Sequence, residues 1–107
     1  MIFSKCFINN FGLFFNMEGL FSRIEPDGWT ALVLLNTEER VNEVTLEAFD
    51  ENGVLQGVEV LNLSPHQRYL ATTADIFDDD ISHAAYIHFS AEESLSAFQI
   101  NGSSDGN

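Results

Sequence analysis

Residues 41–63 of this chain, VNEVTLEAFDENGVLQGVEVLNL, are the stretch that decides the expected fold. In its first half, Val44, Leu46 and Ala48 occupy every second position, and this period of two predicts a β-strand with two different faces. The sequence at 50–53 then contains an Asn-Gly pair, which tolerates the positive φ angles of a tight hairpin turn. The stretch therefore predicts a β-hairpin.

The return run of this hairpin changes its pattern partway. Val58 and Val60 lie on one face of the expected strand, with Glu59 between them on the other face. Leu61 and Leu63 then place apolar side chains on the face of Glu59. A strand whose parity changes contains a bulge or passes from one sheet to another. We therefore expect an irregularity near the middle of this strand.

The rest of the chain reads as short β-runs separated by polar turns. Residues 29–35, WTALVLL, are apolar on both faces, as in the middle strand of a sheet. Further strands are expected at 67–71, 85–89 and 95–100. Residues 72–77 suggest a helical turn, with Thr73 as a candidate N-cap. About six or seven short strands at spacings of about ten residues predict an all-β fold, an antiparallel β-sandwich rather than an α/β protein.

The first 21 residues are rich in phenylalanine, and their pattern leaves two structures open. The phenylalanines recur at helical spacing, but Asn9, Asn10 and Gly12 disfavour a helix and aromatic residues favour strands. A biological start at Met17 is a further alternative. If the segment is ordered, its aromatic side chains need a cover, from the core or from a second copy in a symmetric homodimer. The ligand or interface candidates are Phe3, Phe7, Phe11, Phe14 and Phe15.

The expected organisation is a single sandwich domain with short extensions. We expect a Phe-rich N-terminal strand or arm at 1–21, the β-sandwich domain at 22–101 and a flexible tail at 102–107. Lys5 precedes an apolar run, but Asn9 and Asn10 interrupt that run and no small-x-small cleavage site follows. The chain therefore shows no convincing signal peptide, and its localisation stays open.

The composition excludes several classes of partner. There are 17 acidic residues and 4 basic ones, which give a net charge of −13. This balance argues against nucleic acid, because affinity for phosphates is built on Lys and Arg, and against anionic membrane surfaces. The apolar runs are also too short for a membrane-spanning helix. The single cysteine, Cys6, excludes an internal disulfide and a Cys-based zinc site.

Sequence motifs for catalysis are absent, so we expect no catalytic residues and no enzyme activity. There is no Gly-x-Ser-x-Gly motif, and Cys6 has no base close to it in sequence. His66, His83 and His88 are too poorly arranged along the chain to suggest a zinc site or a general base. Trp29, the tyrosines and the phenylalanines suggest a platform for sugars or apolar ligands, although aromatic residues of small sandwiches more often form the core.

The acidic run near residue 78 is the one weak candidate for a cofactor. Carboxylate-rich loops bind Ca²⁺, and the candidate ligands are Asp75, Asp78, Asp79 and Asp80. Their spacing does not fit an EF-hand, and a solvated acidic turn explains them as well. We therefore expect no cofactor, with calcium as the alternative.

The order of landmarks from residue 28 to residue 106 resembles a known type of module. The segments are GWTALVLLN, VTLEAFDENGVLQG, LSPHQRYLATTADIF and AAYIHFSAEESLSAFQINGSSDG. Together they resemble the immunoglobulin- or fibronectin-III-like β-sandwich modules of bacterial secreted and cell-surface proteins. The resemblance implies a scaffold or binding module without catalysis and fixes no functional residue.

The sequence therefore predicts a non-enzymatic interaction or structural module that self-associates. The alternative is a module that binds a small apolar ligand or a carbohydrate, with calcium at residues 75–80 as a variant of that reading.

Overall fold

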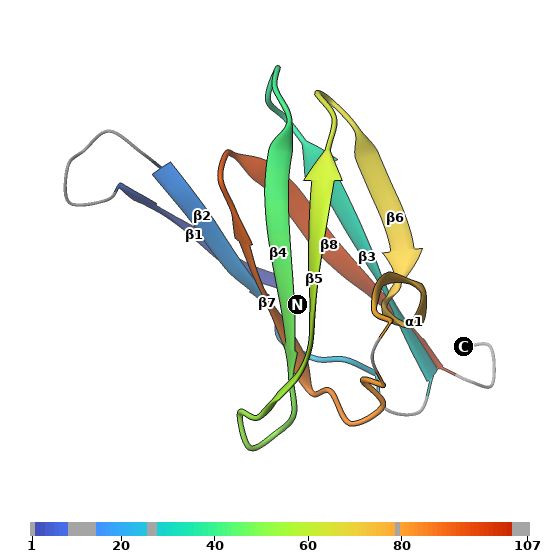
Figure 1. Ribbon diagram of the computed structural model, residues 1–107. Helices are drawn as coiled ribbons and strands as arrows, with labels where there is room; N and C mark the ends of the chain where they lie inside the picture. The colour runs from blue at the N-terminus through green and yellow to red at the C-terminus, as the bar shows by residue number, and fades with distance from the viewer. Residues whose placement is uncertain (1, 9–14, 26–27, 79, 104–107) are drawn as a thin grey trace.

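Two antiparallel sheets, drawn as two layers in Figure 1, make up the computed structural model of the protein. The structure describes the backbone of residues 2–8, 15–25, 28–78 and 80–103, and the side chains from residue 17 to residue 102 within these ranges. This architecture confirms the expected all-β, antiparallel sandwich.

The larger sheet has five strands in the order β1-β2-β7-β4-β5, and the smaller sheet has three in the order β6-β3-β8. The strands of the larger sheet are β1 (Ile2–Ile8), β2 (Phe15–Phe21), β4 (Asn42–Phe49), β5 (Leu55–Leu63) and β7 (Tyr86–Ala91). Those of the smaller sheet are β3 (Gly28–Asn36), β6 (Arg68–Thr72) and β8 (Leu95–Ser103). One short helix, α1 (Thr73–Ile76), follows β6. The part of the chain from residue 28 onward forms six of the described strands, within the six to seven expected, and the N-terminal segment supplies two more.

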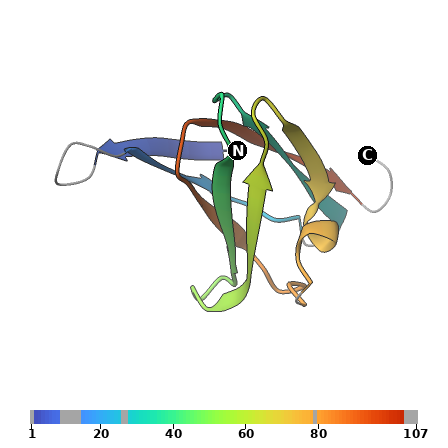
Figure 2. The ribbon, with the colours of Figure 1, turned by 45° about the horizontal axis from the view of Figure 1, so that its top comes forward.

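The N-terminal segment, for which helix and strand were both open, is a β-hairpin. β1 pairs with β2, and β2 continues the sheet by pairing with β7 from Met17↔Ala91 to Phe21↔Ile87. Figure 2 shows this hairpin extending beyond the rest of the larger sheet. The side chains of Phe3, Phe7, Phe11, Phe14 and Phe15, which were the predicted interface, lie outside the part of the chain whose side chains the structure describes.

The central hairpin forms as its sequence predicts. The carboxylate of Asp50 accepts hydrogen bonds from the backbone N–H groups of Asn52 and Val54, both at 2.9 Å, and Gly53 adopts a φ of 79°. Glycine adopts this conformation without strain because it has no Cβ atom to clash at positive φ. The turn residues and the strand periodicity both predict the same hairpin, so it can be predicted from the sequence.

The expected irregularity of β5 was misplaced. Residues 57–63 pair without interruption with residues 48–42, and the register shifts only where Ala48 and Phe49 face Gly57 and Leu55. The extra residue is therefore Gln56, next to the turn, and Leu61 causes no change of face. Val58 and Val60 are the outward-facing positions of β5, and they are 41% and 48% exposed.

The core lies between the two sheets. β3 is the middle strand of the smaller sheet, as its apolar sequence predicts, and its inward residues Leu32 and Leu34 are fully buried. Opposite them, the rings of Phe21 and Phe89 pack with centroids 5.2 Å apart and an interplanar angle of 36°. The largest fully buried apolar side chains are Phe21, Phe89, Leu32, Leu34, Leu46, Leu63, Ile87 and Val44.

Element ends differ from the expected ones at two places. Thr72, and not Thr73, caps α1, because its Oγ1 accepts a hydrogen bond from the N–H of Asp75 at 3.3 Å. The last strand continues beyond residue 100 to Ser103, which pairs with Gly28, so β8 includes the first residues of the predicted tail. This extension is important for the surface described below, because it brings Gly102 opposite Trp29.

Two buried asparagines hold one end of the sandwich together. The side-chain N–H₂ group of Asn36, at the end of β3, donates to the carbonyl oxygens of Arg40, Leu63 and Ser64 at 2.8, 3.1 and 3.0 Å. Asn42, at the start of β4, donates to the carbonyls of Glu93 and Ser94 and accepts from the N–H of Glu93. These amides provide hydrogen-bond partners for backbone groups at the strand ends and in the adjoining loops.

Candidate binding surface

The described aromatic residues lie in the core, in a partly buried pair on the outer face of the larger sheet (Phe49 and Tyr86), and on one exposed face. Phe21, Phe77 and Phe89 are buried, and Tyr69 and Tyr86 are partly buried. Trp29 and Phe98, in contrast, are 46% and 49% exposed. The aromatic platform considered from the sequence is therefore reduced to these two side chains among the described residues.

Trp29 and Phe98 belong to a continuous apolar patch on the outer face of the smaller sheet. Register places Leu70 of β6 and Phe98 of β8 on either side of Val33, and Ile100 beside Ala31. Since directly paired residues point to the same side of a sheet, all of these side chains face away from the core. We call the exposed apolar side chains of this face the outer strip; they are Trp29, Leu35, Leu70, Phe98 and Ile100.

Trp29 has a defined position because Gly102 leaves room for it. The two residues are a cross-strand pair, and a Cβ atom added to Gly102 would overlap the indole atoms Cε2, Cζ2 and Nε1. The indole ring therefore occupies the space above the backbone of β8 that a side chain at 102 would fill. Aromatic side chains commonly cover a glycine of an edge strand in this way.

A shallow groove of about 330 Å³ lies at the other end of the strip. Leu35, Leu70 and Phe98 line it, and Arg68 and Ser96 provide its polar groups. An apolar surface with a few hydrogen-bonding groups is typical of ligand-binding sites.

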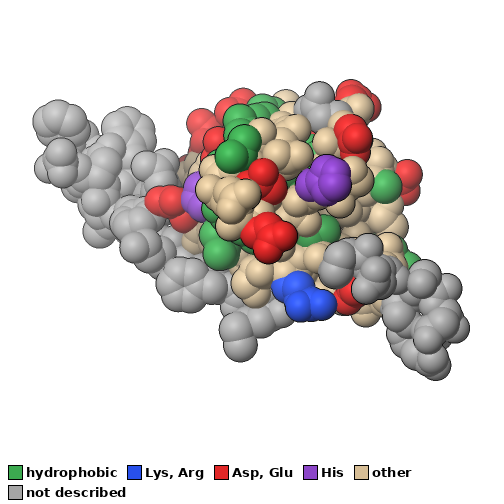
Figure 3. All heavy atoms as spheres, turned by 90° about the horizontal axis from the view of Figure 1, so that it is seen from below, with side chains coloured by type: hydrophobic (Ala, Val, Ile, Leu, Met, Phe, Trp, Pro, Cys, Tyr) green, Lys and Arg blue, Asp and Glu red, His purple; other side chains and the backbone are tan. Residues whose placement is uncertain are grey.

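The charge of this face differs from that of the rest of the chain. The outward positions of the three strands hold one charged residue, Arg68, and no carboxylate, although the chain has 17 acidic residues. Acidic side chains predominate over basic ones on the face seen from below in Figure 3. The outer strip is therefore a carboxylate-free surface on a strongly acidic protein.

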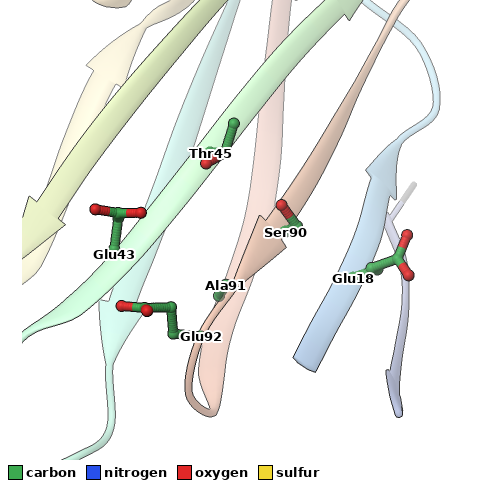
Figure 4. A pocket seen from close by; sticks show the side chains of 6 residues that line it. All are labelled: Glu18, Glu43, Thr45, Ser90, Ala91 and Glu92. Atoms are coloured by element: carbon green, nitrogen blue, oxygen red, sulfur yellow. The ribbon is translucent and has the colours of Figure 1, made fainter. Parts of the chain in front are cut away.

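The outer face of the larger sheet has the opposite character, with an acidic groove of about 360 Å³. Figure 4 shows Glu43 and Glu92 at one end of this groove and Glu18 across it, with Ser90 between them. In the part of the chain that the structure describes, no group of three or more His, Cys, Asp or Glu residues is arranged to hold a metal ion.

His88 lies on this acidic face and connects three strands. Its Nε2 is 2.7 Å from Oε1 of Glu18 on β2, and its Nδ1 is 3.2 Å from Oε1 of Glu47 on β4. A neutral imidazole donates one hydrogen bond, whereas a protonated imidazole donates to both carboxylates. Since both ring nitrogens face carboxylates of the sheet, His88 links β2, β7 and β4.

The acidic run proposed for calcium does not form a recognisable site in its described part. Asp75, Asp78 and Asp80 are all exposed, and Asp79 lies outside the described residues. The hydrogen bonds that Asp80 accepts from Ser82, one of them from the backbone N–H at 3.0 Å, hold the pKa of Asp80 below its ordinary value. A carboxylate that caps its own turn in this way has a structural role, and the calcium hypothesis stays a prediction.

The other residues singled out in the sequence remain apart from one another. His66 lies in the turn between β5 and β6 with a φ of 60°, and His83 lies in the loop before β7. Tyr69 faces the core side of β6, where burial raises the pKa of its phenol and the carboxylates of Asp75 and Glu59 raise it further. Tyr86 stacks on Phe49 with ring centroids 5.3 Å apart. None of these groups joins the outer strip.

Sequence reasoning missed Phe98, Leu70, Arg68 and Gly102 as surface residues. The run 95–100 is apolar at both parities, so its pattern does not say which side faces the core. The one signal in the sequence was Gly102 inside a strand, because a strand glycine marks a close approach by another group.

Comparison with known proteins yields only distant matches. No protein-family model matches the chain, and no curated protein matches it. Among solved structures, the chain is similar to the family 11 carbohydrate-binding module from Clostridium thermocellum in complex with a β-1,3-1,4-mixed-linked tetrasaccharide. That match covers 94% of this chain and 80% of that chain, with 11% identity and a TM-score of 0.44. A second match, to the family 11 module of the cellulosomal cellulase Lic26A-Cel5E of Clostridium thermocellum, covers 94% and 78%, with 12% identity and a TM-score of 0.44.

These matches are too distant to assign a ligand, and the assignment to the immunoglobulin- or fibronectin-III-like modules stays a prediction. Within the described residues, no helix is long and apolar enough to cross a membrane.

Proposed function

We propose that this protein is a non-catalytic binding module that holds a carbohydrate on the outer strip. The observation that carries this proposal is the exposed indole of Trp29, fixed above Gly102 and on the same face as Phe98. The C–H groups on one side of a sugar ring are apolar and carry partial positive charge, so they pack on the negative face of an aromatic ring.

The groove beside Phe98 supports the same ligand chemistry. Arg68 supplies hydrogen-bond donors and Ser96 supplies a hydroxyl that both donates and accepts, which together suit the hydroxyl groups of a sugar. Leu35 and Leu70 provide the apolar floor. Polar groups that fix orientation on an otherwise apolar surface are the usual composition of such a site.

Replacing Trp29 by alanine is expected to weaken carbohydrate binding by roughly tenfold while leaving the fold intact. Trp29 is the single tryptophan of the chain, so its fluorescence reports directly on the outer strip. In the unmodified protein, a bound sugar chain should shift the emission of Trp29 to shorter wavelengths as it excludes water. Affinity electrophoresis in gels containing soluble polysaccharides, mixed-linked β-glucan among them, then compares the unmodified protein with Trp29→Ala.

The matched control is Val60→Thr, because Val60 is 48% exposed on the outer face of the other sheet. We expect this variant to bind as the unmodified protein does. Equal retardation of Trp29→Ala and the unmodified protein would place the binding surface elsewhere. No retardation and no change of emission with any polysaccharide of the panel would reject the carbohydrate proposal.

Self-association through the same face is the second candidate function. The observation that favours it is the absence of carboxylates from the outward positions of β3, β6 and β8. Each copy has a net charge of −13, and the repulsion between two copies is weakest when they meet through this face. An apolar patch of this kind is also a usual dimer surface.

Light scattering across a concentration series tests this second candidate. Association should strengthen with added salt, because salt screens the repulsion between the acidic copies. It should be lost in Leu70→Glu, since Leu70 is the most exposed side chain of the strip, at 63%. A monomeric mass at all concentrations and salt levels would eliminate the dimer. A dimer that survives Leu70→Glu would assign the contact to another surface, such as the N-terminal hairpin.

A further inference from the structure

We propose that the ligand of the outer strip is a neutral, extended polysaccharide that lies along β8 and contacts Trp29 and Phe98 together. This inference rests on the proposed carbohydrate-binding function and adds the charge, the minimum length and the direction of the ligand.

The direction follows from the positions of the apolar groups on one strand. Phe98, Ile100 and Gly102 occupy alternate positions of β8 and therefore share its outer face, and the indole of Trp29 covers Gly102. The two aromatic rings and the isoleucine between them thus form a track that follows β8. Phe98 and Ile100 are 49% and 43% exposed, so the track is open to solvent.

The minimum length follows from the spacing of that track. Gly102 is four residues beyond Phe98, which corresponds to about 13 Å of extended strand. This span is longer than one sugar ring, so a single sugar packs on only one of the two aromatic groups. A chain of several sugars reaches both, and the second contact then forms within an already bound ligand at high effective concentration.

The charge of the ligand follows from the contrast between the two outer faces. A polyanion is repelled by a protein with a net charge of −13, and the single cation of the face, Arg68, is too little to reverse this. A polycation is attracted to the acidic face with Glu18, Glu43 and Glu47 instead. A neutral chain is the ligand whose approach to the carboxylate-free strip has no electrostatic cost.

Gly102 determines where Trp29 lies, and it provides the sharpest variant. In Gly102→Ala the new methyl group overlaps the indole ring, which is an exposed side-chain end and can swing away. Trp29 is then still present but displaced from the track. We expect Gly102→Ala to lower the affinity for long chains by roughly tenfold, about as much as Trp29→Ala does. If the position of the tryptophan did not matter, Gly102→Ala would bind long chains as the unmodified protein does.

The experiment is a calorimetric titration with neutral oligosaccharides from disaccharide to hexasaccharide, of the type that retards the protein in the gels. The affinity of the unmodified protein should rise by roughly tenfold or more over the series. Phe98→Ala and Gly102→Ala should each bind the hexasaccharide about as weakly as the disaccharide, whereas Val60→Thr should keep the full rise. Urea unfolding of each variant verifies that the fold is retained.

Other results would overturn the inference in distinguishable ways. If disaccharide and hexasaccharide bind equally well, or if Phe98→Ala keeps the length dependence, the two-contact track is wrong although the carbohydrate function stands. If a uronate-bearing chain binds more tightly than its neutral counterpart, the neutral charge is wrong. If no carbohydrate binds, the proposed function and this inference both fall.

Discussion

Replacing Phe21 by alanine is expected to lower the free energy of unfolding by about 3–5 kcal/mol. Phe21 is fully buried, and its ring packs against that of Phe89. The substitution removes the burial of a large apolar side chain and leaves a cavity that the surrounding β-sheets close only in part. Because small domains are stable by only about 5–15 kcal/mol, this single change removes a large part of the total stability.

Urea unfolding followed by circular dichroism measures this effect as a lower transition midpoint. The matched control is Phe98→Ala, the same substitution at a side chain that is 49% exposed, for which we expect a loss below about 1 kcal/mol. A double-mutant cycle with Phe89→Ala should give a coupling of about 0.5–1.5 kcal/mol for the aromatic pair. A loss for Phe21→Ala as small as that of Phe98→Ala would mean that β2 is not part of the core.

This test also bears on the N-terminal segment. Phe21 is the last residue of β2, and β2 pairs with β7 in the middle of the chain's larger sheet. A chain that begins at Met17 would keep this pairing and the buried ring, and would lose β1. At least one phenylalanine of this segment, Phe21, therefore belongs to the core.

Replacing Asn36 by alanine is expected to cost about 2–4 kcal/mol. Asn36 is fully buried, its amide nitrogen donates to three carbonyl oxygens, and its Oδ1 accepts from the N–H of Glu38 at 3.0 Å. Each buried polar group that loses its partner costs about 1–3 kcal/mol, and part of this is recovered where water reaches the loop. The loss should lower the melting temperature by several degrees per kcal/mol.

Asn62→Ala is the matched control, because Asn62 is an exposed asparagine on β5. We expect it to change the stability by less than about 0.5 kcal/mol. Calorimetric melting of both variants distinguishes the two sites. If Asn36→Ala melts together with Asn62→Ala, the hydrogen bonds of Asn36 to the carbonyls of Leu63 and Ser64 contribute nothing to stability.

Local features of this protein could be predicted from its sequence, and the reason is that neighbouring residues produce them. The alternation around Val44 and the Asn-Gly pair define the β4–β5 hairpin without any distant partner. The apolar run of β3 likewise identifies a middle strand. The number of short strands and their polar turns then indicate the all-β class and the sandwich.

The bulge of β5 and the position of the N-cap were wrong by a few residues, because both depend on where pairing stops. The parity change at Leu61 suggested an irregularity at that residue, but the partly buried Glu59 takes an inward position of this edge strand, in the same unbroken register as Leu61 and Leu63. Alternation is a weak guide where burial is incomplete.

Only the tertiary structure decided which groups form the candidate site. Trp29 and Gly102 are far apart in the chain, and Trp29 reaches Gly102 only because β3 and β8 pair in one particular register. β3 and β8 are apolar on both faces, so their sequences do not state which face is covered by the larger sheet and which is exposed. Packing of the two sheets makes that choice, because the face that buries Leu32 and Leu34 leaves Trp29 and Phe98 in solvent.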